Sequence, residues 1–325
     1  MKSKLTTVLC IGLVQALLGI AFPADAAPKQ STGITYNATL LNIPAPASAN
    51  GINDVGQIVG QYGTSGNQYG FIYKFTQEPL VTLITNTLSD GTVNTQAYGI
   101  NNAGQVVGAT ATATGGNITY GFIYNGGNFT NLSAPGVTPG NGGSTVALGI
   151  NSTGQIVGYA GGVVSPGGVV GPYEGFLYSG GAYQILSVPG ATNTYANGIN
   201  STGEIVGYWD SESGTREGGF IYQNGVYTAI NVPGATSTQP RAINDLGQIL
   251  GTYVDASHIA HFFIYENGNY DVITVLLGGQ AFLGPAVQSG GVNGINKAGQ
   301  IVGFGTTSNC LSCAFVANPV VKLKK

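Results

Sequence analysis

The chain has 325 residues and a net charge of −3, and only 7% of its residues are charged. Nucleic acids and anionic membrane surfaces attract basic patches, so this composition excludes an electrostatic footprint for either partner. Hydrophobic residues make up 43% of the chain and glycine contributes 54 residues. This combination is typical of a folded all-β protein with many tight connections.

The N-terminus carries the pattern of a secretory signal. Lys2 and Lys4 precede an apolar run over residues 5–22, and residues 24–26 (Ala-Asp-Ala) match the small-x-small pattern of a signal peptidase site. We therefore expect residues 1–26 to be a signal peptide and the secreted protein to be periplasmic or extracellular. A retained membrane anchor is the alternative, which the polar residues within the run disfavour. After cleavage, no membrane span is expected.

One ten-residue motif recurs six times in the rest of the chain. Its fullest form is Gly-Ile-Asn-x-x-Gly-Gln-Ile-Val-Gly, and the successive spacings between its asparagines are 48, 50, 49, 44 and 52 residues. A period of this size indicates a propeller, a solenoid or an array, and the six similar repeats predict a single domain over residues 27–325. We number the repeats 1 to 6 by their asparagines, which are Asn53, Asn101, Asn151, Asn200, Asn244 and Asn296.

Each copy of the motif predicts a tight β-hairpin. Asparagine suits the first position of a type I turn because its side chain can bond the main chain two residues on, and glycine accepts the positive φ that ends the turn. A β-branched pair such as Ile58-Val59 then opens a second strand. The expected role of the six asparagines is therefore turn formation, which favours a structural role over ligand binding.

Two further apolar runs follow in the repeats. Runs such as residues 121–124 (Gly-Phe-Ile-Tyr) predict a third strand, and segments such as residues 227–232 predict a fourth. Four short strands per repeat are typical of a propeller blade, so we expect an all-β, six-bladed β-propeller of four-stranded blades. Alternating burial is expected to place one phenylalanine of each third strand in the core. These residues are Phe71, Phe122, Phe176, Phe220, Phe263 and Phe315.

The N-terminal end of the secreted chain carries an extra predicted strand, and the last repeat lacks its fourth strand. Residues 38–44 resemble residues 228–233, the fourth strand of repeat 4, whereas repeat 6 ends soon after its third strand. We therefore expect the N-terminal strand to complete the last blade. This pairing would close the ring and cover a sheet edge that otherwise promotes aggregation.

These motifs resemble the bacterial extracellular repeats known as HAF repeats, after a His-Ala-Phe signature in the third strand. The resemblance covers essentially the whole secreted chain, through the ten-residue motif, the Gly-Phe-Ile-Tyr runs and the Val-Pro-Gly-Ala-Thr segments at 188–192 and 232–236. It implies an exported, β-rich, propeller-like protein and carries over no catalytic residue. The signature itself is eroded, since only repeat 5 keeps the histidine, as His261.

Much of the scarce charge gathers in the loops expected between the second and third strands of repeats 4 and 5. Loops of this kind lie on one face of a propeller, where binding sites are common. One interpretation is a set of solvated loop tips. The other is a pocket in which a tryptophan platform, flanked by acid, guanidinium and imidazole groups, binds a sugar or another polar ligand. The candidate residues are Trp209, Asp210, Glu212, Arg216, Arg241, Asp255 and His258.

The same loops do not define a metal, cofactor or active site. Residues 210–221 match a calcium loop only in part, and His258 and His261 lack an evident third ligand. The sequence also shows no nucleophile elbow and no phosphate-binding loop. We therefore expect no metal and no cofactor. An extracellular hydrolase or lyase is the alternative, and its titratable candidates are Asp210, Glu212, Glu217, Asp255 and His258.

Cys310 and Cys313 are separated by two residues near the C-terminus. In an exported protein they predict an oxidised local loop, with free thiols as the alternative. For the whole chain, we expect a monomeric binding scaffold that recognises a carbohydrate or an envelope protein through its variable loops. A structural or adhesive envelope protein without a discrete pocket is a further alternative.

Overall fold

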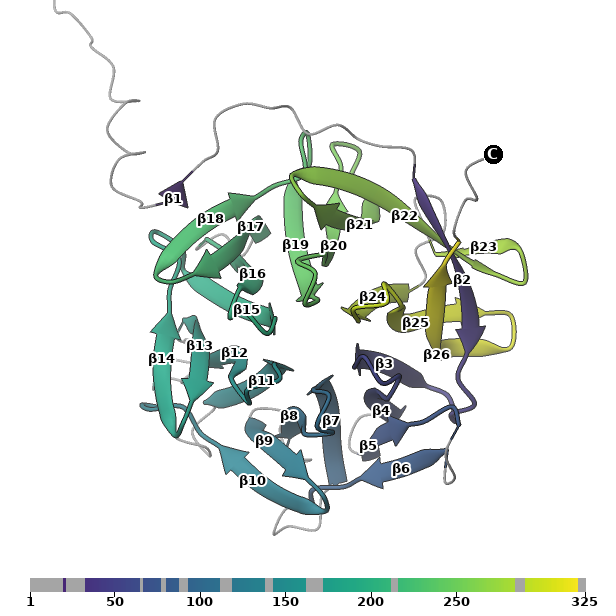
Figure 1. Ribbon diagram of the computed structural model, residues 1–325, viewed down its shortest axis with the longest axis horizontal. Helices are drawn as coiled ribbons and strands as arrows, with labels where there is room; N and C mark the ends of the chain where they lie inside the picture. The colour runs from purple at the N-terminus through teal and green to yellow at the C-terminus, as the bar shows by residue number, and fades with distance from the viewer. Residues whose placement is uncertain are drawn as a thin grey trace, which may run out of the picture.

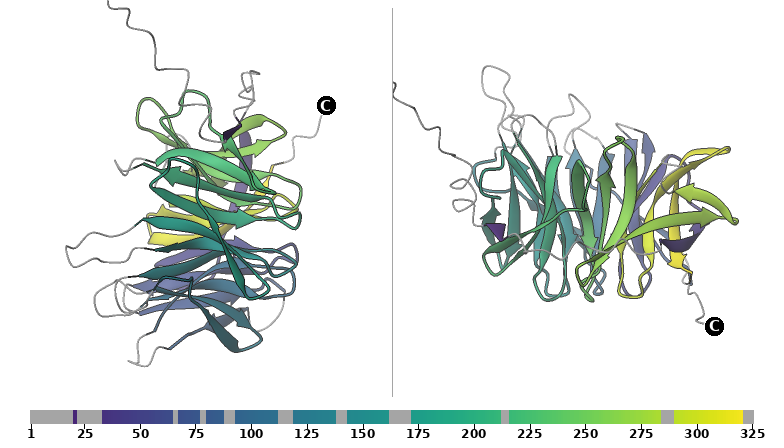
Figure 2. Two further views of the ribbon diagram at one scale, coloured as in Figure 1. Left: turned by 90° about the vertical axis from the view of Figure 1, so that its left-hand side faces the viewer. Right: turned by 90° about the horizontal axis from the view of Figure 1, so that it is seen from above.

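The computed structural model describes residues 20–21, 33–64, 67–76, 80–87, 93–111, 119–137, 143–161, 172–211, 216–283 and 290–320. These residues form strands and turns, and no helix capable of crossing a membrane occurs among them. The strands surround a central axis (Figure 1), and the ring that they form is shorter along this axis than it is across (Figure 2). The chain is therefore all-β and propeller-like. The expected signal peptide lies outside the described residues, apart from β1 (Ile20–Ala21).

Each repeat contributes consecutive antiparallel strands that run outward from the axis (Figure 1). The innermost strands are β3 (Ala47–Ile52), β7 (Val93–Ile100), β11 (Ser144–Ile150), β15 (Asn193–Ile199), β19 (Ser237–Ile243) and β24 (Gly290–Ile295). The second strands are β4 (Ile58–Thr64), β8 (Val106–Ala111), β12 (Ile156–Gly161), β16 (Ile205–Asp210), β20 (Ile249–Val254) and β25 (Ile301–Thr307).

The third strands are β5 (Asn67–Tyr73), β9 (Thr119–Asn125), β13 (Tyr173–Ser179), β17 (Arg216–Gln223), β21 (Ala260–Glu266) and β26 (Cys310–Pro319). The outer strands of repeats 1 to 5 are β6 (Val81–Ile84), β10 (Asn128–Leu132), β14 (Ala182–Leu186), β18 (Val226–Ile230) and β22 (Asn269–Leu277). In repeat 6 the outer position next to β26 is taken by β2 (Ile34–Leu40), and β23 (Gln280–Leu283) adds to β22.

The hydrogen bonds do not separate the repeats into independent sheets. Short parallel pairs join β5 to β7 and β9 to β11, and the strands fall into sheets of 5, 12 and 9 strands. The expectation of separate four-stranded sheets is thus met only in part, because parallel pairing at a few positions links neighbouring repeats.

The N-terminal strand occupies the outer position of repeat 6, as the sequence suggested, and it also contacts repeat 5. Strand β2 pairs antiparallel with β26, from Tyr36 opposite Pro319 to Leu40 opposite Phe315, and parallel with β22. The strand begins at Ile34 and ends at Leu40, so it starts earlier than residues 38–44, where the sequence pattern placed it. Both of its edges are hydrogen-bonded, which removes two exposed edges at once.

The predicted turns and core residues are confirmed. In repeat 1 the N–H of Gly56 donates to the carbonyl oxygen of Asn53, and Gly56 has a φ of 79°. The six third-strand phenylalanines are each 2% exposed or less. Each ring lies over the glycine opposite it on the second strand: a Cβ added to Gly60 would come within 2.7 Å of Cζ of Phe71. The glycine therefore makes room for the aromatic ring.

The repeat asparagines do more than form turns. Their side chains are buried, and in five repeats the side-chain N–H donates to the main-chain carbonyl oxygen of the next repeat's asparagine. These pairs are Asn53 to Asn101 (3.0 Å), Asn101 to Asn151 (3.1 Å), Asn151 to Asn200 (3.0 Å), Asn244 to Asn296 (2.9 Å) and Asn296 to Asn53 (3.2 Å). The last bond joins repeat 6 to repeat 1, so the asparagines tie the ring together around its axis.

We expect Asn151→Ala to lower the free energy of unfolding by about 3 kcal/mol, because it leaves buried main-chain groups without partners. Oδ1 of Asn151 accepts the N–H of Gln155 at 2.9 Å, and its side-chain N–H reaches Asn200. Ser152→Ala is the matched control, since Ser152 is exposed in the same turn. Denaturant titration of both variants tests the expectation, and equal stability of the two would contradict it.

Candidate ligand-binding site

The structure places two of the repeat 4 candidates, Trp209 and Asp210, against the core. Trp209, on β16, is half-buried and packs against the core cluster that contains Val188 and Tyr227. The cavity beside Trp209 has a volume of only 30 Å³. Asp210 is buried, and Oδ1 of its carboxylate accepts the side-chain N–H of Asn193 at 2.5 Å. Neither side chain forms the open platform that the sequence suggested.

The other candidates are dispersed. Glu212 lies outside the described residues, and the main chain of Arg216 pairs with that of Asp210 at the start of β17. Arg241 lines a cavity on the central axis. His258 is exposed in the turn between β20 and β21, with a φ of 62°. Among the candidates whose side chains the structure describes, Trp209, Asp255 and Arg241 line three different cavities, so they do not share one pocket.

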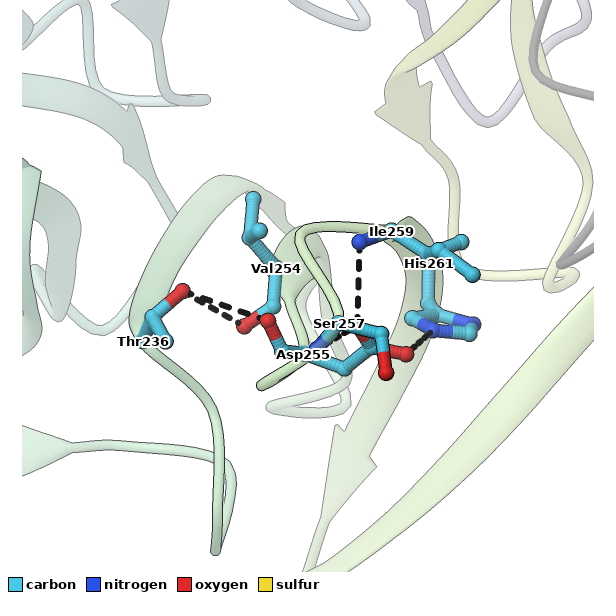
Figure 3. Close-up of polar contacts among 6 residues, drawn as sticks. All are labelled: Thr236, Val254, Asp255, Ser257, Ile259 and His261. Carbon is cyan, nitrogen blue, oxygen red and sulfur yellow. Dashed lines mark hydrogen bonds and ion pairs between the residues drawn. The ribbon is translucent and has the colours of Figure 1, made fainter.

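Asp255 is the candidate around which a polar network forms (Figure 3). Its Oδ2 lies 2.7 Å from Nε2 of His261, and its Oδ1 accepts the main-chain N–H groups of Ser257 at 2.8 Å and Ile259 at 2.9 Å. The hydrogen bond with His261 is the main cause that lowers the pKa of Asp255, and the N–H of Ile259 adds to it. The carboxylate is thus ionised and held in one orientation.

Sequence reasoning missed the part played by His261. The sequence pattern assigns this histidine to the repeat signature and favours His258 as the functional imidazole, whereas His261 is the one that contacts Asp255. Alternation along the strands could have identified His261, because it lies two residues before the buried Phe263 and therefore on the same face of its strand. His261 lies opposite Tyr253 on the neighbouring strand, and their rings stack with centroids 4.7 Å apart. Nδ1 of His261 is buried and has no hydrogen-bond partner among the described residues.

A cavity of 310 Å³ opens beside this network. Tyr253, His261 and Tyr270 contribute aromatic walls, and Asp255 contributes the carboxylate. Val272 and the chain segment 232–234, which connects repeat 4 to repeat 5, complete the wall. Thr236, just after this segment, donates its hydroxyl to the carbonyl oxygen of Val254 at 3.2 Å (Figure 3), which fixes the segment against the loop of Asp255.

Repeat 4 shows why the cavity exists in repeat 5. The cross-strand pair Tyr253 and His261 corresponds to Trp209 and Gly218 in repeat 4, because each pair lies two residues beyond the same second-strand glycine. The indole of Trp209 covers Gly218 so closely that an added Cβ would lie 3.0 Å from Nε1. The larger ring therefore fills in repeat 4 the space that stays open in repeat 5.

The remaining sequence-predicted groups lie apart from this cavity. Cys310 and Cys313 are joined by a disulfide at the start of β26. Within the described ranges, no group of three or more histidine, cysteine, aspartate or glutamate side chains is arranged to hold a metal ion. What the cavity offers chemically is an oriented carboxylate and imidazole next to aromatic surfaces.

No protein-family model matches the chain, and no curated protein matches it in sequence. Among solved structures, the chain is similar to the β-propeller domain of the Trilobed protease from Pyrococcus furiosus, at 12% identity, with 83% of this chain and 78% of that chain covered and a TM-score of 0.44. It is also similar to the Aleuria aurantia lectin in complex with α-methyl-L-fucoside, at 12% identity, 90% and 97% coverage and a TM-score of 0.46.

A third similar structure is AofleA from Arthrobotrys oligospora, at 12% identity, 90% and 92% coverage and a TM-score of 0.48. At such identities a likeness concerns only the fold, and the fucoside is a ligand of the Aleuria protein. The binding properties of the present chain therefore have to be argued from its own side chains.

Proposed function

We propose that this chain is an exported, six-bladed β-propeller that binds a neutral saccharide in the cavity beside Asp255. Six repeats that each supply consecutive antiparallel strands, with β2 next to β26, support the six-bladed assignment. The signal-peptide pattern and the resemblance to HAF repeats support export. The observation that carries the binding function is the meeting of two tyrosines with an oriented carboxylate in one cavity.

The chemistry of the cavity suits a saccharide. A sugar ring presents apolar C–H faces, which pack well on aromatic rings, and hydroxyl groups, which donate to carboxylates. Tyr253 and Tyr270 supply the first kind of contact and Asp255 the second. Because a carboxylate has about four lone-pair positions, Asp255 can accept a ligand hydroxyl in addition to its bonds within the protein.

Preorganisation further supports this function. The two main-chain N–H groups and the imidazole fix the carboxylate of Asp255 before any ligand arrives, so little side-chain entropy is lost on binding. The volume of 310 Å³ lies at the lower end of the range for small-molecule sites. We therefore expect a monosaccharide unit, free or at the end of a longer chain, as the ligand.

The test uses residues 27–325 and a panel of methyl glycosides, with binding followed by ligand-observed NMR. Asp255→Asn should weaken binding about tenfold or more, because it removes a charge-assisted acceptor. The double variant Tyr253→Trp/His261→Gly copies the side chains of repeat 4 and should abolish binding by filling the cavity. Glu266→Gln is the matched control, since it removes a carboxylate of the same repeat that does not line the cavity.

Thermal denaturation of each variant establishes that it is folded. Unchanged affinity in the Tyr253→Trp/His261→Gly variant would exclude the cavity as the site. A folded wild-type protein that binds none of the methyl glycosides would contradict the saccharide assignment itself.

A further inference from the structure

Every innermost strand carries a β-bulge at the same place in the repeat. The register of each inner pair shifts just before the Gly-Ile-Asn segment, and one residue is left without a partner on the second strand. A bulge redirects the side chain of its extra residue, and bulges are over-represented next to functional sites. The six bulge residues are Asn50, Tyr98, Leu148, Asn197, Arg241 and Asn293.

These six side chains line one cavity of 150 Å³ on the central axis. They are of four residue types, whereas the segment that follows them is nearly constant. The glycine after the bulge brings neighbouring strands close together: a Cβ on Gly99 would lie 2.8 Å from the carbonyl oxygen of Leu148. The constant residues thus build the ring, and the variable residues determine what its centre can bind.

Three of the bulge residues are asparagines with fixed side chains. Each donates its side-chain N–H to the carbonyl oxygen that precedes the bulge residue of the next repeat. The pairs are Asn50 to Ala97 (2.8 Å), Asn197 to Pro240 (2.7 Å) and Asn293 to Ala49 (3.0 Å). The cavity is therefore a preformed polar site whose walls are held by bonds between repeats.

Arg241 is the one formally charged residue among the six that line the cavity. Its side chain is half-buried, and Nη2 donates to Oε1 of Gln239 at 3.2 Å, which orients the guanidinium. Burial raises the pKa of Tyr98, so its phenol stays neutral and adds no negative charge. A cation at the centre of a ring of neutral dipoles favours an anion, and a guanidinium matches a carboxylate through two parallel hydrogen bonds.

We propose that the axial cavity binds one small carboxylate, with Arg241 as the residue that recognises the anion and the neutral bulge residues as the surrounding wall. A volume of about 150 Å³ accommodates a molecule the size of benzene, and because this cavity is partly open, the portion of the ligand that it holds has about six non-hydrogen atoms. This site is separate from the cavity beside Asp255, and its ligand is of a different chemical class.

The experiment titrates residues 27–325 with acetate, butyrate and lactate at low ionic strength and follows each by ligand-observed NMR. Lactamide, the neutral counterpart of lactate, and inorganic phosphate are titrated in parallel. We expect saturable one-site binding of at least one carboxylate, with lactamide and phosphate binding at least about tenfold more weakly than that carboxylate.

Arg241→Leu should weaken carboxylate binding by at least about tenfold, because it removes the cation. The variant should fold, since leucine already occupies the equivalent bulge as Leu148. Arg241→Lys keeps the charge but loses the planar fork, and an intermediate affinity is expected. Asp255→Asn is the control at the other cavity and should leave carboxylate binding unchanged.

Several outcomes would overturn the proposal. These are equal affinity for lactate and lactamide, binding of phosphate without binding of any carboxylate, and full carboxylate affinity in a folded Arg241→Leu protein. Absence of saturation by all three carboxylates up to roughly 10 mM would overturn it as well. Because the Asp255 variants do not touch this cavity, their results and those of the Arg241 variants can be separated.

Discussion

Replacing Gly158 with alanine should destabilise the protein by about 3 kcal/mol or more, a large effect for the addition of a single methyl group. Gly158 lies on β12, between β11 and β13. A Cβ at this position would lie 1.9 Å from the carbonyl oxygen of Val146 and 2.9 Å from Cζ of Phe176. The first atom belongs to the paired main chain and the second to a fully buried ring, so neither can move aside without breaking the sheet.

The matched control is Gly198→Ala. A Cβ on Gly198 would meet Cα of Ala242 at 3.1 Å, a much smaller overlap, and repeat 5 already carries alanine at the equivalent position. We expect this variant to lose no more than about 1 kcal/mol. Unfolding in guanidinium chloride measures both changes. If Gly158→Ala were no less stable than Gly198→Ala, the close approach described for Gly158 would be wrong.

Replacing Tyr36 with alanine should have a second large effect, a loss of about 3 to 5 kcal/mol in the free energy of unfolding. Tyr36 is 2% exposed and belongs to the core cluster beneath β22 and β26. Its strand, β2, is hydrogen-bonded on both edges. Weakening the anchor of β2 should therefore expose two strand edges together, and we expect aggregation that rises with protein concentration.

Tyr36→Phe is the control for this prediction, because it keeps the buried ring and removes only the hydroxyl. We expect it to cost about 1 kcal/mol or less. Denaturant titration gives the stabilities, and light scattering during incubation gives the aggregation. A Tyr36→Ala protein that is as stable and as soluble as the Tyr36→Phe protein would show that β2 does not hold the ends of the ring together.

The candidate sites illustrate how far residue types alone can lead. The sequence singled out Asp255 because charge is scarce in this chain, and Asp255 does line the larger cavity. It also singled out Trp209 for its ring, yet that ring fills a space in repeat 4 and packs in the core. An aromatic side chain can line an open cavity or fill it. The outcome depends on the residue opposite it on the next strand, which is Gly218 in repeat 4 and His261 in repeat 5.

Arg241 is a second residue whose position could not be inferred from its residue type and its neighbours in the sequence. The sequence pattern groups it with the other charged residues of repeats 4 and 5, whereas its side chain lines the axial cavity with five residues from other repeats. The shift of register before each Gly-Ile-Asn segment directs it there. The pattern that could have revealed the axial cavity was present in the sequence: the position just before each Gly-Ile-Asn segment varies among Asn, Tyr, Leu and Arg, although the segment itself is nearly constant.

What the sequence by itself determined was the repeat, the hairpin turns, the buried phenylalanines and the strand that joins the two ends. All of these follow from local rules: turn chemistry at Asn and Gly, alternation along a strand, and a repeated period. Only the tertiary structure decided which residues share a cavity, because the inner strands bring together residues that are 43 or more positions apart, such as Asn197 and Pro240. Local sequence patterns span only a few residues, so they do not show which distant residues become neighbours when the ring forms.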